Sequence, residues 1–268
     1  VYLGDEYIEM LKNPKHGFGS GMNPCIDCRA MMFKAAKKHM EEIGADFIIS
    51  GEVLGQRPMS QHGPALKTIE KESGLEGKIV RPLSAALLPP TDPEKIGLIK
   101  RENLGMIKGR SRKPQLQLAR EFEIENPPNA GGGCLLTDPA FAIRAKDLFK
   151  HTETPTTNDI DLLKIGRHFR FDQNVKLIVG RNKDENEVIK ALALPDDILL
   201  EAQDHVGPVS LLRGKELDRF ENLAAAITLR YSDAPKDKES MVIAEKGKNR
   251  ANLSIMSAEE SSYLKYRI

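Results

Sequence analysis

Residues 25–50 read CIDCRAMMFKAAKKHMEEIGADFIIS, and this stretch decides the fold class of the first part of the chain. Apolar residues recur at helical spacing after the two cysteines, with lysines and glutamates between them. Gly44 is typical of a helix end, and residues 46–50 are short and apolar enough for a buried strand. A helix, a glycine cap and an apolar strand in this order predict one αβ unit of a parallel sheet.

The rest of the chain extends this pattern and then changes it. A second αβ unit is predicted from a helix over 64–73 and a strand over 78–83, with further helices near 94–103, 114–123 and 138–149. The polar, proline-containing stretch 152–158 predicts a boundary between domains 1–151 and 156–268. The second part predicts strands over 175–179, 197–201, 209–212 and 241–245, and helices over 184–193 and 216–230. We therefore expect a parallel-sheet α/β domain followed by a smaller α+β domain.

Composition sets limits on the class of protein. The chain has 268 residues, of which 40% are hydrophobic and 29% charged, as in an ordinary globular protein. A formal net charge of +1 argues against a strongly basic nucleic-acid binder, although a local basic face can still bind phosphates. No apolar run is long enough to cross a bilayer and no signal peptide is visible, so we expect a cytoplasmic protein.

The chain has three cysteines, Cys25, Cys28 and Cys134. In a reducing compartment, a CxxC pair with a distant third cysteine suggests metal, cluster or redox chemistry. A closed zinc site lacks a visible fourth ligand, and His16, His39, His62 and His151 show no metal-ligand spacing. The alternative is that the three cysteines are buried and chemically inert. This alternative fits Cys134 better than it fits the CxxC pair.

Four short motifs carry a resemblance to a known family. Asn23-Pro24-Cys25-Ile26-Asp27-Cys28, followed by Gly44-Ala45-Asp46, resembles the tRNA 2-thiouridylases, with Cys28 on their catalytic cysteine. Residues 51–61 resemble the nucleotide-side loop of the tRNA 4-thiouridine synthetases, and Arg81-Pro82-Leu83 resembles a segment common to ATP pyrophosphatases. Gly131-Gly132-Gly133-Cys134 takes the place of the second reactive cysteine. The resemblance implies a PP-loop ATP-pyrophosphatase domain with an incomplete adenine nucleotide alpha hydrolase-like fold.

Residues 176–182, with Asn186, resemble the RNA-binding domain of NFACT proteins. Clustered basic residues give two groups of candidate RNA contacts. The first is Lys108, Arg110, Arg112 and Lys113, and the second, in the NFACT-like region, is Arg167, Arg170, Arg181 and Asn182. A run of basic residues is more often a solvated face, and Phe169 and Phe171 between the basic residues are equally well explained as core.

The resemblance implies ATP-dependent sulfur insertion into a tRNA uridine, forming 2- or 4-thiouridine. The resemblance also implies ATP with Mg²⁺ as the cofactor, and tRNA and a sulfur donor (a persulfide carrier or sulfide) as partners. The candidate cofactor-binding residues are Cys25, Gly51, Gln56, Ser60, Gln61 and Arg81. The family's ATP loop, Ser-Gly-Gly-x-Asp-Ser, is not found in this sequence, so we expect this chain to be inactive alone. The alternative is a non-catalytic, ribosome-associated RNA-binding protein with a structural metal site.

Two readings of the cysteines follow from this chemistry. In one, Cys28 and Cys134 are catalytic, and one bears a persulfide that the other resolves by forming a disulfide. In the other, Cys25, Cys28 and Cys134 ligate three irons of a [4Fe–4S] cluster and leave the fourth iron free for sulfide. Because Cys28 lies near the start of a helix, we expect its pKa to be lowered.

Overall fold

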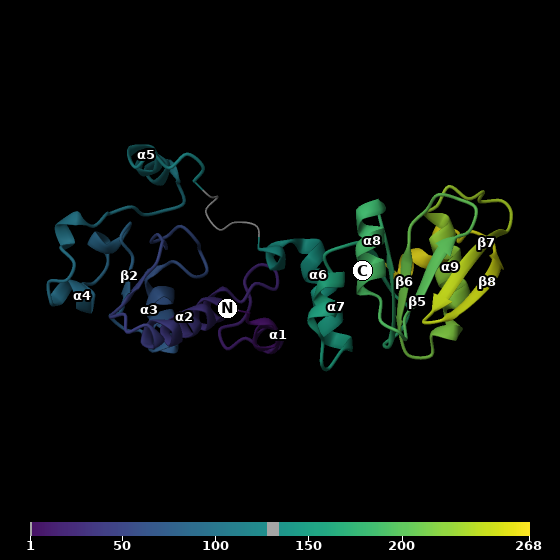
Figure 1. Cartoon of the computed structure of the whole chain (residues 1–268), viewed down its shortest axis with the longest axis horizontal. Helices are drawn as coiled ribbons and strands as arrows, with labels where there is room; N and C mark the ends of the chain where they lie inside the picture. Colours follow the sequence, from purple (N-terminus) through teal and green to yellow (C-terminus); the bar gives the residue numbers. More distant parts are fainter. Residues whose placement is uncertain (1, 128–133) are drawn as a thin grey trace. The chain divides into compact units, whose positions relative to one another are not determined.

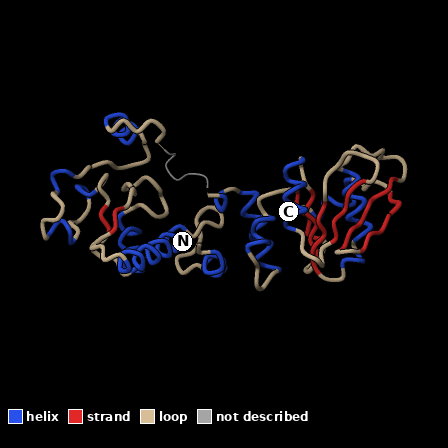
Figure 2. Tube along the Cα trace, viewed as in Figure 1, coloured by secondary structure: helices blue, strands red, loops and turns tan. Residues whose placement is uncertain are grey.

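A computed structural model describes residues 2–127 and 134–268. Its contacts divide the chain into two compact units, Val1–Asp138 and Pro139–Ile268 (Figures 1 and 2). This division falls before the helix at Pro139–His151 (α6), whereas the sequence suggested a boundary at 152–158. Over the two described ranges, every helix is too short or too polar to cross a bilayer.

The first unit is built around a parallel pair of short strands. Helix α1 (Gly4–Lys12) precedes α2 (Cys25–Glu42), β1 (Ile48–Ile49), α3 (Gly63–Ser73) and β2 (Ile79–Val80). Ile48 pairs with Ile79 and Ile49 with Val80, in parallel, which confirms the predicted helix–strand order. The helices pack on the strands through a buried apolar cluster of Phe33, Met40, Ile69, Leu75 and Ile79.

The remainder of the first unit consists of short helical pieces. After β2 come η1 (Ala85–Leu87), α4 (Asp92–Lys95), η2 (Arg101–Asn103), α5 (Lys113–Glu121) and η3 (Leu135–Thr137). The single helix expected near 94–103 is therefore two short pieces with a break between them. The break follows α4. This helix begins with a capping box formed by Thr91 and Glu94, and it ends at Ile96, whose backbone is outside helical geometry.

The second unit is a six-stranded antiparallel sheet with helices on both faces. The strand order is β3-β4-β6-β5-β7-β8. The strands are β3 (Arg167–Arg170), β4 (Val175–Val179), β5 (Ile198–Ala202), β6 (Ser210–Gly214), β7 (Ser240–Lys246) and β8 (Asn249–Ile255). The helices are α6, α7 (Thr157–Leu162), α8 (Lys183–Leu192), α9 (Glu221–Arg230) and α10 (Glu260–Tyr263), with η4 (Leu217–Arg219) and η5 (Leu264–Tyr266). The expected α+β pattern is present, and β3 and β8 are two strands that the sequence analysis did not predict.

Each face of this sheet has its own core. Phe169, Leu177 and Leu212 face α9 in a large buried cluster, so Phe169 and Phe171 are core residues. Ile178 and Leu211 point the other way, toward α7 and α8. Alternation along the strands therefore assigns successive residues to two different layers.

A row of three cations crosses the second face of the sheet. Arg170 is paired in register with Lys176, and Lys176 with Arg213, so the three lie on adjacent strands. Like charges directly opposite each other destabilise a sheet, and carboxylates offset them here. Asp147 of α6 accepts two hydrogen bonds from Nε of Arg170 at 3.1 and 3.2 Å and one from its NH2 at 2.6 Å.

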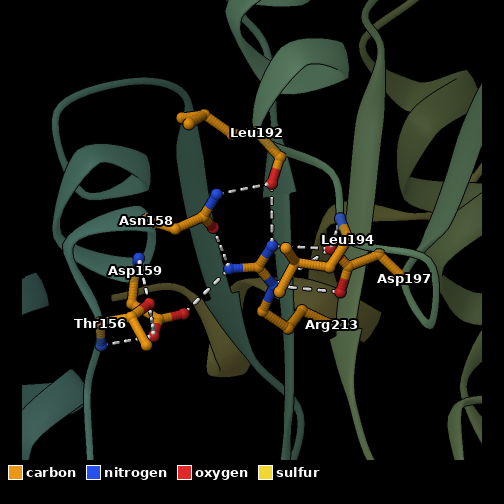
Figure 3. A network of polar contacts seen from close by, with 7 residues as sticks. All are labelled: Thr156, Asn158, Asp159, Leu192, Leu194, Asp197 and Arg213. Carbon is orange, nitrogen blue, oxygen red and sulfur yellow. Dashed lines mark hydrogen bonds and ion pairs between the residues drawn. The ribbon is translucent and has the colours of Figure 1, made fainter.

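Arg213 is the centre of a polar network that attaches α7 to the sheet (Figure 3). Its Nε and NH2 donate to Asp197 at 2.7–3.2 Å, and its NH1 donates to Asn158 and Asp159 at 2.8 and 2.9 Å. NH2 also reaches the Leu192 carbonyl oxygen at 3.1 Å. Each nitrogen of the guanidinium group thus has an acceptor, and three separate segments are held together by one side chain.

Candidate functional site

The three cysteines lie near one another at the start of α2. Cys25 is its first residue and Cys28 follows one turn later. The Tyr7 hydroxyl of α1 is hydrogen-bonded to the Cys28 thiol, and both Cys25 and Cys134 lie close enough to influence the two groups electrostatically. The Met22 amide donates to the Leu136 carbonyl oxygen at 2.9 Å and so joins the segment of Cys134 to the loop before α2. Residues distant in sequence therefore form one thiol site, defined as Tyr7, Cys25, Cys28 and Cys134.

Burial controls the ionisation of this site. Desolvation raises the pKa of Cys28, and the hydrogen bond from Tyr7 and the charge of Arg29 only partly oppose it. The expectation of a lowered pKa at Cys28 is therefore wrong. Its amide already donates to the Pro24 carbonyl oxygen at 2.8 Å, so Cys28 lies beyond the free amides that stabilise an anion at a helix start.

Tyr7 remains protonated beside the thiols. Burial and the neighbouring thiolates of Cys28, Cys134 and Cys25 raise the pKa of Tyr7 well above its usual value. Its hydroxyl is thus available as a hydrogen-bond donor to a sulfur anion. Sequence reasoning missed Tyr7, because it lies on a different helix from the cysteines and belongs to no motif.

Asn23, the first residue of the Asn23–Cys28 motif, has a local structural role. This side chain is buried, and its Nδ2 donates to Cys25 Sγ at 3.3 Å. Its Oδ1 accepts from the Gly21 amide at 3.1 Å, which fixes the amide group. Asn23 therefore orients the Cys25 thiol from the loop that precedes the helix.

The next feature is the arrangement of side chains that could bind a metal ion. Within residues 2–127 and 134–268, no group of three or more His, Cys, Asp or Glu side chains is arranged to hold a metal ion. The [4Fe–4S] cluster on Cys25, Cys28 and Cys134 stays a prediction. The glycines Gly131–Gly133 that precede Cys134 lie outside the described residues.

A buried ion-pair network lies where β1 and β2 end. Arg81 and Glu52 are 3% and 4% exposed, and Arg81 Nε donates to Glu52 Oε2 at 3.0 Å. Arg81 NH1 is hydrogen-bonded to Glu70, and Arg29 Nε lies 3.6 Å from the other oxygen of Glu52. Arg81 NH2 and Glu52 Oε1 have no hydrogen-bond partner. Arg81 therefore has a structural ion pair and, in addition, unused donor capacity.

The predicted nucleotide-side loop lies next to this network. Ser60 and Gln61 are buried, and the Gly55 amide donates to the Gln61 carbonyl oxygen at 2.6 Å, closing the loop. Gln56 Nε2 and Gln61 Oε1 are buried without partners, while Gly51 is exposed. Buried polar atoms without partners are uncommon in folded proteins and often mark where a ligand or water binds. Nucleotide binding by Gly51, Gln56, Ser60 and Gln61 stays a prediction.

A basic pocket forms in the second unit at the end of β4 and the start of α8. It is a cavity of about 400 Å³ lined by Arg167, Arg181, Asn182, Lys183 and Tyr231, among others. Three of the four RNA-contact candidates of this domain therefore come together. Their individual environments differ: Asn182 caps α8 by accepting from the Glu185 amide at 2.9 Å, and Arg181 is ion-paired with Glu185.

The structure separates Arg170 from this pocket. Its guanidinium group is bound by Asp147 and lines a different cavity, together with Lys176 and Arg213. In the first unit, Lys108, Arg110 and Lys113 are exposed and Arg112 is half-buried. RNA contacts by these residues stay predictions. Tyr231, by contrast, joins the pocket without any signal in the sequence, because a tyrosine after a helix gives no indication of its partners.

The fold and these two sites define a chain in which a thiol-bearing parallel α/β unit is joined to an antiparallel α+β unit with a basic pocket. Residues 6–87 match the family model of the thiamine biosynthesis protein ThiI, and residues 166–267 match that of the NFACT protein RNA binding domain. The suspected fusion of a ThiI-like region with an NFACT-type domain is confirmed. Comparison with curated proteins gave no match.

Among solved structures, the chain is similar to the C-terminal part of the fibronectin/fibrinogen-binding protein from Streptococcus suis. The two are 13% identical, with a TM-score of 0.35, and 90% of each chain is covered.

Proposed function

We propose that this chain acts in tRNA modification by ATP-dependent sulfur transfer to a uridine, giving 2- or 4-thiouridine. The observation that carries the proposal is the meeting of Cys25, Cys28 and Cys134 around Tyr7 in the ThiI-like unit. Sulfur transfer needs a nucleophilic sulfur and a second thiol to release it, and the proximity of the three cysteines supports these two tasks.

The chain's own residues have distinct tasks in this proposal. A persulfide on Cys28 attacks the activated carbonyl carbon of the uridine through its terminal sulfur, and the activated oxygen leaves. The Cys134 thiolate then attacks Cys28 Sγ, which forms the Cys28–Cys134 disulfide and releases the thiolated base. A cellular thiol reductant restores both thiols, and the sulfur donor reloads Cys28. Tyr7 donates its hydrogen bond to the Cys28 sulfur anion.

ATP supplies the activation of the uridine oxygen when it is bound. The unpartnered polar atoms of Gln56, Gln61 and Arg81 support a nucleotide contact at the ends of β1 and β2, where ligands of open α/β sheets bind. The basic pocket and the NFACT family match support RNA as the partner of the second unit.

The test is a set of cysteine variants in cells. The gene is deleted, and the full reading frame is restored as wild type, Cys28→Ser, Cys134→Ser or Cys25→Ser. Thionucleosides in tRNA digests are then quantified by mass spectrometry. We expect one thionucleoside to disappear on deletion, to return with the wild type and to stay absent with Cys28→Ser and Cys134→Ser.

Cys25→Ser separates the two readings of the cysteines. The persulfide–disulfide reading expects the thionucleoside to return, whereas a three-cysteine cluster expects it to stay absent. The cluster reading also expects visible absorbance in protein purified without oxygen. Normal levels of every thionucleoside in the deletion strain would refute sulfur transfer altogether.

A further inference from the structure

Arg167 has an unusual position in the basic pocket. Its guanidinium carbon lies 4.5 Å from the centre of the Tyr231 ring, and its NH1 donates to the Gly180 carbonyl oxygen at 3.2 Å. The side chain is half-buried and lines the cavity of about 400 Å³. A guanidinium group held over an aromatic ring has one covered face, and its opposite face is a flat surface for another planar group.

The ring beneath Arg167 is firmly supported. Tyr231 packs on Phe169 and Tyr263, with ring centres 6.4 and 6.1 Å away, and Phe169 is fully buried. The Tyr263 hydroxyl also donates to the Tyr231 hydroxyl at 3.4 Å. Because this aromatic cluster belongs to the core of the sheet, Tyr231 has little freedom to move away from Arg167.

The walls of the pocket are equally well fixed. Asn186 of α8 donates to the Gly207 carbonyl oxygen at 3.3 Å and accepts from the Val209 amide at 3.0 Å. A Cβ atom on Gly180 would lie 2.1 Å from Asn186 Oδ1, so only glycine permits this approach. The site is therefore formed before any ligand binds, which lowers the entropic cost of binding.

We propose that Arg167, backed by Tyr231, is the platform on which an unpaired RNA base stacks, so that the second unit binds single-stranded RNA. Stacking of unpaired bases on aromatic rings and arginine planes is the common way in which proteins recognise single-stranded RNA. Val206, 80% exposed, offers an apolar edge beside the base, and Lys183 offers a charge for a neighbouring phosphate. Bases inside a duplex are stacked on each other and cannot enter such a pocket.

This inference rests on the proposed RNA binding and specifies the form of the RNA. In this proposal the planar guanidinium group of Arg167 stacks on the base, and its positive charge attracts the RNA. A lysine at this position keeps the charge but has no planar group for stacking, so Arg167→Lys tests stacking alone. Arg167→Ala removes both. The matched control is Arg219→Lys, since Arg219 lies 5.6 Å from the Phe220 ring but outside the pocket.

The experiment measures binding of the full chain to an unstructured oligoribonucleotide and to a blunt RNA duplex of the same length. Affinity is measured as a function of salt, and stacking is followed by the fluorescence of a 2-aminopurine base in the single strand. We expect the wild type to prefer the single strand. We expect Arg167→Lys to weaken single-strand binding about tenfold or more, since base stacking contributes on the order of 1–3 kcal/mol per base. The salt slope should stay unchanged, and Arg219→Lys should bind as the wild type.

Three results would overturn the inference in different ways. Equal binding of duplex and single strand by the wild type would reject the preference while leaving RNA binding intact. Unchanged single-strand affinity and 2-aminopurine signal in Arg167→Lys and Arg167→Ala would reject the platform. No binding of either RNA by the wild type would reject RNA binding by this unit, and the proposed function would lose its RNA contact as well. Far-UV circular dichroism of each variant checks that it is folded.

Discussion

The two units of the chain differ in what their interiors are made of. The second unit buries apolar side chains on both faces of a six-stranded sheet. The first unit has a two-stranded sheet and a small buried cluster around Phe33 and Ile69. It also contains most of the buried polar side-chain atoms that lack partners among the described residues, including those of Glu52, Gln56 and Arg81. The second unit is thus stabilised mainly by apolar packing, whereas the first unit buries more polar atoms without hydrogen-bond partners among the described residues.

The largest effect expected from this difference is on unfolding. Phe169→Ala removes a fully buried ring from the larger core and should lower the free energy of unfolding of the second unit by about 3–5 kcal/mol. Phe33→Ala, in the small cluster, should have a smaller effect on the first unit. Hydrogen exchange followed by mass spectrometry on the whole chain measures the two units separately.

Phe122→Ala is the control for this pair, because Phe122 is 73% exposed and should change the free energy of unfolding by less than about 0.5 kcal/mol. A greater loss from Phe33→Ala than from Phe169→Ala would contradict the comparison of the two cores.

The next effect concerns the pH dependence of the second unit. Burial lowers the pKa of Lys176 to about 7, with Arg170 and Arg144 adding to the effect and Asp147 opposing it. Between pH 7 and the ordinary value of 10.5, the unfolded chain keeps the proton that folded Lys176 has lost. The free energy of unfolding therefore rises with pH in this window, by at most about 1.4 kcal/mol per unit.

Lys176→Met should flatten this rise and stabilise the second unit most at pH 6, where the buried charge is fully present. Urea unfolding of both proteins from pH 6 to 9 measures it. Lys215→Met, at an exposed lysine near the same cavity, is the matched control. Parallel stability curves for the wild type and Lys176→Met would show that Lys176 is not the titrating group.

The smallest effect is at the thiol site of the first unit. Tyr7→Phe removes the hydrogen bond to Cys28 and should slow alkylation of Cys28 at pH 8 by about threefold to tenfold, since such a bond contributes about 1 kcal/mol. Site-resolved mass spectrometry of iodoacetamide-treated protein measures the rate. Tyr2→Phe makes the same chemical change at a side chain that is 79% exposed, and should leave the rate as it was. If Cys28 is alkylated at the same rate in the wild type and in both variants, Tyr7 does not influence the reactivity of Cys28.

Local sequence patterns predicted most of the elements of both units. The helical spacing of 25–42, the glycine after it and the apolar strand residues are signals within a few neighbours, and α2, β1 and β4 lie where they were expected. Strands β3 and β8 were missed. The residues of β8 are largely exposed and polar, so this strand lacks the apolar alternation of a half-buried strand.

Contacts between residues distant in the sequence were harder to predict. The meeting of Cys28 with Tyr7 depends on how α1 packs on α2, and that of Arg167 with Tyr231 depends on the route of the chain across the sheet. The sign of the pKa change at Cys28 was predicted wrongly for a related reason. A position near a helix start is visible in the sequence, whereas the burial that outweighs it is a property of the assembled fold.

The Arg213 network has a practical consequence for dividing the chain. The region that matches the NFACT model starts at 166, yet two acceptors of Arg213, Asn158 and Asp159, lie before it. A fragment starting at 166 would lose both acceptors of Arg213 NH1, including the ion pair with Asp159, and would keep only the ion pair with Asp197 and the Leu192 carbonyl oxygen. A fragment of this half should therefore begin at or before Thr156, which caps α7, and a fragment that starts at 166 should have a lower free energy of unfolding.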